Sequence, residues 1–446
     1  MTGAARVPVA RTASVGNPPS LETHAVPTRA ILALAAWGGL IAVAYVWARA
    51  IQAGGRAIHL GAPPLVGTPG FRVEPWMAIA VVLAAATVAG GPALADRLGW
   101  RPMVLISFAT AAAWAVALAL GEGPEGLIRP LGSPHEYLRD VPLVGSPGSF
   151  LSSFVDRIDD HTTHVRAHPP GLLLTLWGMD RVGLSGPWPA AALLVTGGAA
   201  AVPATLVALR EVAGEARARS IAPFLVLAPA AVWVATSADA LFAGVSAWGA
   251  ALVVLASGRT PRSDAFATGG GVLLGLSAFL SYGMVLVASV PMAVATRRRR
   301  VRPLIVAAAG ATVVAAAFGL AGFWWPDGLA ATRREYAESI ARLRPYGYFL
   351  IGNLAAFAVA TGPAVAAGLA RLRDRRVMVL VAGGCAAVVI ADLTGLSKGE
   401  VERIWLPFVP WVAVATCALP AAGRRGWLAA QAAVGLAVQA GVMTPW

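Results

Sequence analysis

Two carboxylates, Glu136 and Asp140, lie four residues apart in the sequence HEYLRD. A positioned carboxylate can take the proton of a hydroxyl group as that group attacks another molecule. If this turn is helical, the spacing places both side chains on one helical face. We therefore predict that one of them is a general base; the alternative is that both only cap or solvate a surface helix. The next candidates are Asp159 and Asp160.

Three histidines, His161, His164 and His168, lie in the segment HTTHVRAHPP. Together with Asp160 they are residue types that hold a divalent metal, although three imidazoles suit zinc better than magnesium. The proline after His168 favours extended backbone there, so a helix is not expected to hold all three rings on one side. We favour hydrogen bonding to a substrate by His164 and His168. A bound divalent metal (Mg or Mn) and a structural role for His168 at the start of the next helix are the alternatives.

A charged segment, TGLSKGEVERIWLPFVPW (394–411), stands directly before an apolar run. It contains Lys398, the only lysine beside 34 arginines. Cations at this depth lie where a lipid phosphate would sit, and an arginine offers phosphate a two-point fork. We predict that Lys398 and Arg403 bind phosphate and that Glu400 or Glu402 orients them. A plain interfacial anchor of basic and tryptophan residues would have a similar sequence.

One further acid, Asp239, lies in ATSADALFAG at the end of an apolar run. Acids at membrane depth are costly and are often functional. We predict a substrate contact for Asp239, with a helix-capping role after Ser237 as the alternative.

The elements that must position these residues are apolar helices. The chain of 446 residues is 57% hydrophobic and 13% charged, with a mean hydropathy of +0.69, which indicates an all-α polytopic membrane protein. We count about thirteen apolar segments that could cross a bilayer. They are centred near residues 40, 86, 111, 198, 228, 248, 274, 289, 312, 358, 385, 411 and 434. Both cysteines fall inside these runs, so a disulfide framework is not expected.

The arginines predict the orientation. If the N-terminal tail is cytoplasmic and the segments alternate, the inner loops carry 21 of the 35 basic residues and 6 of the 22 acids. That asymmetry fits the positive-inside rule, so the net charge of +13 indicates topology and membrane-lipid contact and not nucleic-acid binding. We expect a disordered cytoplasmic tail over residues 1–28 and a single transmembrane domain over 29–446, in the plasma membrane.

One outer loop, residues 122–187, is much longer than the others and holds four of the six histidines. Loops of this length are usually functional. Its segment SFLSSFVDRI (149–158) has the apolar spacing of an interfacial helix, and HPPGLLLTLWGM (168–179) is too short to span. We therefore expect two juxtamembrane helices here. A third amphipathic helix, with Arg333, Arg334, Arg342 and Arg344, is expected in the outer loop 323–347, with anchoring as its role or contact with a carrier lipid or an acceptor as the alternative.

This order of features resembles the GT-C superfamily of integral-membrane glycosyltransferases. The resemblance rests on HEYLRD, the interfacial helix, HPPG with its short helix, VALREVAGEARARS and the following SAD, over residues 105–260, and on the charged segment 394–411. In this order of features the chain is most similar to the protein O-mannosyltransferases, the lipid A aminoarabinose transferases and the actinobacterial cell-wall transferases.

The resemblance implies a GT-C-like fold and transfer of a sugar from a polyprenyl-phosphate donor to a lipid, glycan or protein acceptor of the cell envelope. Heavy use of arginine and alanine suggests a high-GC bacterium, which makes mannose or arabinose plausible as the sugar. The site would be extracytoplasmic, and the anomeric carbon would be inverted. Glu136 or Asp140 would activate the acceptor, and Lys398 and Arg403 would hold the phosphate. A transporter or flippase of a lipid-linked or anionic solute is the alternative; it predicts inverted repeats and polar broken helices near the midplane. A non-catalytic scaffold would not need the acids and histidines of the long loop.

Overall fold

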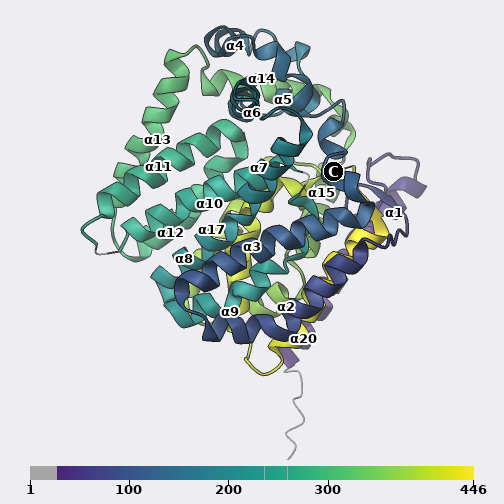
Figure 1. The fold of residues 1–446 in the computed structure, drawn as a ribbon. Helices are drawn as coiled ribbons and strands as arrows, with labels where there is room; N and C mark the ends of the chain where they lie inside the picture. The colour runs from purple at the N-terminus through teal and green to yellow at the C-terminus, as the bar shows by residue number, and fades with distance from the viewer. Residues whose placement is uncertain (1–27, 236, 259, 446) are drawn as a thin grey trace, which may run out of the picture.

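The computed structural model describes residues 28–445 except positions 236 and 259, and it is almost entirely helical (Figure 1). The predicted tail 1–28 lies outside the described residues, apart from Thr28, which begins the first helix. The longer helices are α1 (Thr28–Ala53), α2 (Met77–Arg97), α3 (Trp100–Ala119), α6 (Gly171–Arg181), α7 (Pro187–Ala199), α8 (Ala201–Ala213), α9 (Glu215–Val226), α10 (Ala238–Ala256), α11 (Ser263–Leu280), α13 (Arg302–Leu320), α14 (Trp325–Glu338), α15 (Tyr346–Thr361), α17 (Arg375–Thr394) and α20 (Arg424–Gly441).

The shorter elements connect or extend these helices. The short helices are α4 (Pro147–Ser153), α5 (Thr163–Arg166), α12 (Ser289–Arg297), α16 (Pro363–Arg371), α18 (Val401–Ile404) and α19 (Val409–Ala413). Strands β1 (Thr68–Pro69) and β2 (Val442–Met443) pair antiparallel, Thr68 opposite Met443. This pairing ties the loop between α1 and α2 to the C-terminal end of α20.

The described chain contains eight helices, with α7 and α8 counted as one, that are long and apolar enough to cross a membrane, and the count is nine if the bent pair α15–α16 is one span. The all-α polytopic membrane fold is therefore confirmed. The other predicted segments are helical as well. The segments 282–297 and 401–418 are short helices with 3₁₀ turns, α9 is followed by a 3₁₀ turn, and α20 begins with two arginines. Prolines in or beside several of these helices remove backbone hydrogen bonds and break their regularity.

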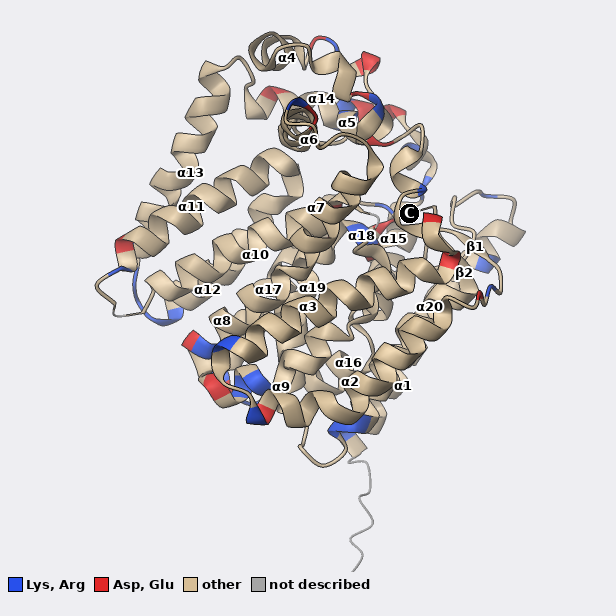
Figure 2. Cartoon of the chain, viewed as in Figure 1, with Lys and Arg blue, Asp and Glu red and all other residues tan. Residues whose placement is uncertain are grey.

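Two ends of the helical bundle carry most of the charged residues (Figure 2). One end, which we call the loop end, holds α4, α5, α6 and α14 (Figure 1). The opposite end holds the α8–α9 turn and the beginnings of α1 and α20. The ribbon between the two ends contains few acidic or basic residues, as a hydrocarbon environment requires.

Helix α10 is the most buried of the candidate spans in the described chain, with 72% of its apolar window inside the protein. A close approach to α7 makes this burial possible, because a Cβ on Gly244 would lie 1.8 Å from the carbonyl oxygen of Gly197. Small residues allow such backbone contact between membrane helices. The N-terminal turn of α10 is consequently fixed at the loop end.

The long loop differs in detail from its prediction. The interfacial helix predicted over 149–158 is only α4, and the chain then turns so that Phe154 and Ile158 are buried in the protein. The short helix predicted within 168–179 is α6, which begins after Pro170 and buries Leu172, Leu173 and Leu176. The third helix is α14, and it is tied to the loop because Thr332 Oγ1 donates a 2.8 Å hydrogen bond to the carbonyl oxygen of Arg166.

Candidate functional site

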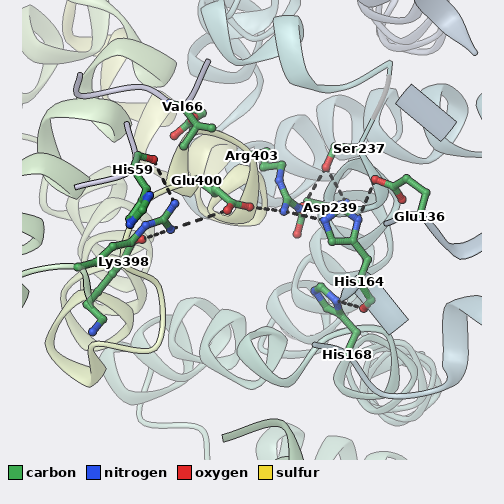
Figure 3. Close-up of polar contacts among 12 residues, drawn as sticks. His59, Val66, Glu136, His164, His168, Ser237, Asp239, Lys398, Glu400 and Arg403 are labelled. Atoms are coloured by element: carbon green, nitrogen blue, oxygen red, sulfur yellow. Dashed lines mark hydrogen bonds and ion pairs between the residues drawn. The ribbon is translucent and has the colours of Figure 1, made fainter. Parts of the chain in front are cut away.

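Arg403 lies at the centre of a buried group of charged residues (Figure 3). Its side chain is 7% exposed, and each terminal nitrogen meets a different carboxylate. Nη1 donates to Asp239 Oδ2 at 2.8 Å, and Nη2 donates to Glu400 Oε2 at 2.5 Å. Burial alone would raise the pKa of Glu400, but Arg403 and Arg344 outweigh it and lower that pKa, so Glu400 is ionised.

Glu136 reaches the same guanidinium through His164. Glu136 Oε1 lies 2.8 Å from His164 Nδ1, and His164 Nε2 lies 3.4 Å from Arg403 Nη2. An arginine nitrogen can only donate, so Nε2 accepts and the proton of the neutral ring lies on Nδ1, where it is donated to Glu136. These three residues therefore form a continuous polar chain from Glu136 to the two carboxylates beyond Arg403. We call Glu136, His164, Asp239, Glu400 and Arg403 the central cluster.

Backbone contacts in the long loop bring Glu136 and His164 together. The N–H of His164 donates to the carbonyl oxygen of His135 at 3.1 Å, and His135 Nδ1 lies 3.1 Å from Thr163 Oγ1. Glu136 itself is extended and precedes a single 3₁₀ turn over 137–139. The helical face predicted for Glu136 and Asp140 is therefore wrong, because one such turn sends the two side chains to different partners.

Asp140 lies away from the central cluster. It is 3% exposed, and its Oδ2 accepts from the N–H of Thr162 at 2.9 Å and lies 3.2 Å from His161 Nδ1. The His161 ring stacks on Phe154, and burial lowers its pKa although Asp140 partly opposes this. Asp140 therefore stabilises the fold of the long loop through buried contacts with Thr162 and His161. The other acids named from the sequence, Asp159 and Asp160, have exposed side chains.

Asp239 occupies the first turn of α10, where Ser237 is the N-cap. Ser237 Oγ accepts from the Asp239 N–H at 3.1 Å and donates to Asp239 Oδ2 at 2.8 Å. The cap is therefore Ser237, and the Asp239 carboxylate serves the guanidinium instead. Asp239 is 1% exposed, and its Oδ1 has no hydrogen-bond partner among the described residues.

The turn before α18 separates Lys398 from Glu400. Gly399 and Glu400 both have left-handed backbone conformations, with φ of 91° and 63°, which is unusual for a glutamate. Glu400 points to Arg403, whereas the Lys398 side chain points away from it (Figure 3). Lys398 Nζ lies 5.8 Å from the ring centre of Tyr336. Lys398 is thus not brought into the central cluster, although its carbonyl oxygen accepts from Arg344 Nη1 at 2.5 Å.

His168 lies behind His164. Its Nδ1–H donates to the carbonyl oxygen of His164 at 2.8 Å, and its ring packs near Tyr137 and Phe242. Burial lowers the pKa of His168 more than Asp239 raises it, so the ring is neutral. His168 therefore fixes the position of His164 in the site.

Two positioning residues were missed by reasoning from the sequence. Arg344, for which only anchoring or contact with a carrier lipid or an acceptor was expected, lies 3.8 Å from Glu400 and donates to the carbonyl oxygen of His59. Asn353 accepts from the N–H of Gly399 at 3.1 Å and donates to the carbonyl oxygen of Ser397. An asparagine inside the apolar run YFLIGNLAAFAVA was the available signal for this second residue.

A metal does not fit the central cluster as it stands. In the described part of the chain, no group of three or more His, Cys, Asp or Glu side chains is placed to hold a metal ion. Asp239 and Glu400 converge on the Arg403 guanidinium, which supplies the local positive charge. Three carboxylates of the cluster, those of Glu136, Asp239 and Glu400, lie around the guanidiniums of Arg403 and Arg344.

Glu402 points the other way, toward the loop between α1 and α2. It is fully buried, and its Oε1 accepts from the N–H of Val66 at 2.8 Å. Its Oε2 has no hydrogen-bond partner among the described residues. Burial raises the pKa of Glu402 to about 7. The sequence had suggested that Glu402 pairs with a cation, but its neutral form is the one this environment favours.

Among known proteins, the chain has a remote structural likeness to a solved membrane protein. No family model and no curated protein matches the chain. The crystal structure of ArnT from Cupriavidus metallidurans in the apo state aligns with 60% of this chain at a TM-score of 0.41 and 15% identity. The aligned part spans about half, 54%, of the length of that structure.

The buried carboxyl of Glu402 predicts a pH-dependent stability. The pKa of the Glu402 carboxyl is higher in the folded than in the unfolded protein. Its contribution to the free energy of unfolding is therefore fully present below about pH 4.5 and is lost as the pH rises through 7. Between pH 5 and 8 the free energy of unfolding of the wild type should therefore fall by an amount on the order of 3 kcal/mol. Glutamine keeps the acceptor for the N–H of Val66 but does not ionise, so Glu402→Gln should not show this fall. Melting temperatures of the purified protein in detergent should show Glu402→Gln gaining on wild type only at high pH. The exposed Glu338→Gln is the control, and equal gains at both pH values would contradict this assignment.

The Arg403 contacts predict a rescue by a second substitution. Arg403→Gln leaves the buried Asp239 carboxylate without its counter-charge and leaves Glu400 with Arg344 alone, so it should lower the free energy of unfolding by about 3–5 kcal/mol. Adding Asp239→Asn removes one of those charges and should restore part of the loss. Thermal or denaturant unfolding in detergent measures both, with the exposed Arg333→Gln as control. If the double variant is no more stable than Arg403→Gln, the carboxylates are not what Arg403 neutralises.

Proposed function

We propose that this protein is a membrane glycosyltransferase of the GT-C type. It transfers a sugar from a polyprenyl-phosphate donor to a hydroxyl of a lipid, glycan or protein acceptor at the loop end, on the extracytoplasmic side of the plasma membrane. The observation that carries this proposal is the contact chain Glu136–His164–Arg403, which joins a candidate base to a buried cation. The resemblance of HEYLRD, HPPG and SAD to that superfamily points the same way.

Glu136 is the base in this proposal. The acceptor hydroxyl gives its proton to the Glu136 carboxylate as its oxygen bonds to the anomeric carbon. The bond from that carbon to the donor phosphate breaks, and its electron pair leaves with the phosphate. His164 donates Nδ1–H to Oε1, so it holds the carboxylate in one orientation and leaves Oε2 for the acceptor. Asp140 is the weaker candidate, because its Oδ2 is already occupied inside the loop.

Arg403 is the group that stabilises the leaving phosphate. Negative charge grows on the phosphate as the bond breaks, and a guanidinium held in a buried site stabilises it strongly. The phosphate would replace Glu400 or Asp239 at one nitrogen of Arg403, with Arg344 close behind Glu400. Lys398 lies beside Tyr336, away from Arg403, where it would contact the donor phosphate on its way in. The high alanine and arginine content favours a high-GC bacterium, and with it mannose or arabinose as the sugar.

The transporter or flippase remains the second candidate because one predicted span is broken. Helices α15 and α16 meet at an angle of 97°, and broken helices form the binding sites of many transporters. Here, however, a neutral side chain forms hydrogen bonds with the backbone on both sides of the break. Gln431 Oε1 accepts from the N–H of Ala364 and Nε2 donates to the carbonyl oxygen of Thr361, so one backbone group on each side of the break is satisfied. The charged residues lie in the central cluster instead.

The central prediction concerns Glu136→Gln. Glutamine keeps the shape and can still contact His164 but cannot accept the proton, so sugar transfer should fall by about 10²–10⁴-fold while the protein remains inserted and folded. Membranes carrying each variant would be supplied with labelled polyprenyl-phosphate sugars, and labelled product would be measured. Asp159→Asn, an exposed acid of the same loop, should keep wild-type transfer.

Two outcomes would contradict the proposal. Transfer that survives Glu136→Gln would remove Glu136 as the base, and loss only in Asp140→Asn would move that role to Asp140. No transfer by wild type from any donor, together with movement of a lipid-linked solute across vesicles, would favour the transporter.

A further inference from the structure

A second collection of arginines lies at the end opposite the central cluster, between the loop that joins α10 to α11 and the loop that joins α12 to α13 (Figure 2). A cavity of about 740 Å³ opens there. Its walls are formed by residues of both loops: Thr260, Pro261, Ser263 and Asp264 from the first, and Arg298, Arg299, Arg300 and Arg302 from the second. We call this cavity the arginine cleft.

Three of its arginines are held in place by neighbours. Arg298 pairs with Glu211 at 2.9 Å, Arg302 Nη2 donates to Asp264 at 2.6 Å, and Arg300 Nη1 donates to the carbonyl oxygen of Gly258 at 3.0 Å. These contacts join three separate parts of the chain. A cleft whose cations are already positioned loses less conformational entropy when an anion binds.

Arg299 is different because it is exposed and contacts no acid among the described residues. Its φ of 55° lies in the left-handed region, which a non-glycine residue adopts only where the surrounding turn holds it. Four arginines therefore line the cleft, and Glu211 and Asp264 neutralise two of them. Two positive charges are left in excess. The positive-inside rule explains why the loop is basic, but it does not explain why the arginines gather in one concave site.

We propose that the arginine cleft binds the phosphate group of an anionic phospholipid in the membrane leaflet at this end, which the arginine distribution predicts to be the cytoplasmic one. The shared chemistry is a phosphate ester, and arginine binds it with two parallel hydrogen bonds. Clusters of basic residues at the membrane surface attract anionic lipids by about 1 kcal/mol per residue.

Apolar side chains beside the cleft favour a lipid over a soluble phosphate compound. Val301 and Ile305 are each 64% exposed, and Met292 is 53% exposed. They flank the arginines at the start of α13 and on α12, and only 22% of the apolar window of α13 is inside the protein. A diacyl lipid would place its phosphate among the arginines and its chains along this apolar surface, where a free phosphate would gain nothing.

The test compares lipid binding by wild type, by Arg299→Gln/Arg300→Gln and by a matched control. Arg373→Gln/Arg375→Gln makes the same charge change in the loop between α16 and α17, on two exposed arginines at the same end. Purified full-length protein in detergent would be titrated with phosphatidylglycerol, with phosphatidylcholine and with inorganic phosphate. The rise in melting temperature would be followed, and bound lipid would be counted by native mass spectrometry.

We expect phosphatidylglycerol to stabilise wild type and the control equally, with one retained lipid, and to bind the cleft variant about 10- to 30-fold more weakly. Equal weakening in both double variants would reduce the effect to general surface charge and overturn the site. An equal response to phosphatidylcholine would overturn the need for an anionic lipid. A full response to inorganic phosphate alone would keep the phosphate chemistry but exclude a lipid as its source. None of these residues belongs to the central cluster, so the outcome is independent of the proposed transfer reaction.

Discussion

A guanidinium buried at 7% exposure must be neutralised from inside the protein, and this requirement on Arg403 organises the loop end of the molecule. Removing a charge from water costs several kcal/mol unless counter-charges with good geometry replace the lost solvent. Asp239 comes from the first turn of α10, Glu400 from the turn before α18, and His164 from α5 in the long loop. Three segments far apart in the sequence are thus joined through one side chain.

The backbone around Arg403 holds these side chains in place, and part of it adopts an unfavourable conformation. Glu400 is held in a left-handed conformation next to Gly399, and Asn353 ties that turn to α15 through two hydrogen bonds. Ser237 caps α10 and also donates to Asp239, so the carboxylate cannot rotate freely. Strain and buried polar groups that are fixed in this way are typical of sites where geometry matters more than stability.

Much of this architecture could be predicted from composition and local pattern. The apolar segments, the long loop, the short helix after HPPG and the amphipathic α14 all follow from hydropathy and from proline positions, which act locally. The residues of the central cluster were all named from the sequence, but their pairing was not. A single 3₁₀ turn between Glu136 and Asp140 decides which acid meets His164, and two left-handed residues decide that Glu400 and not Lys398 faces Arg403. Such turns depend on contacts with distant segments, for which the local sequence carries no signal.

The two ends of the molecule use arginine in opposite ways, and the difference follows from burial. At the loop end Arg403 is enclosed and shares its terminal nitrogens between two carboxylates. At the other end Arg299 is exposed and the arginine cleft keeps a positive excess. A buried cation whose partners can be exchanged is suited to transient binding of an anion, because the carboxylates can pair with the guanidinium again when the anion leaves. A partly solvated cation without a counter-charge favours an anion that stays, since no acid among the described residues contacts Arg299 and competes with that anion.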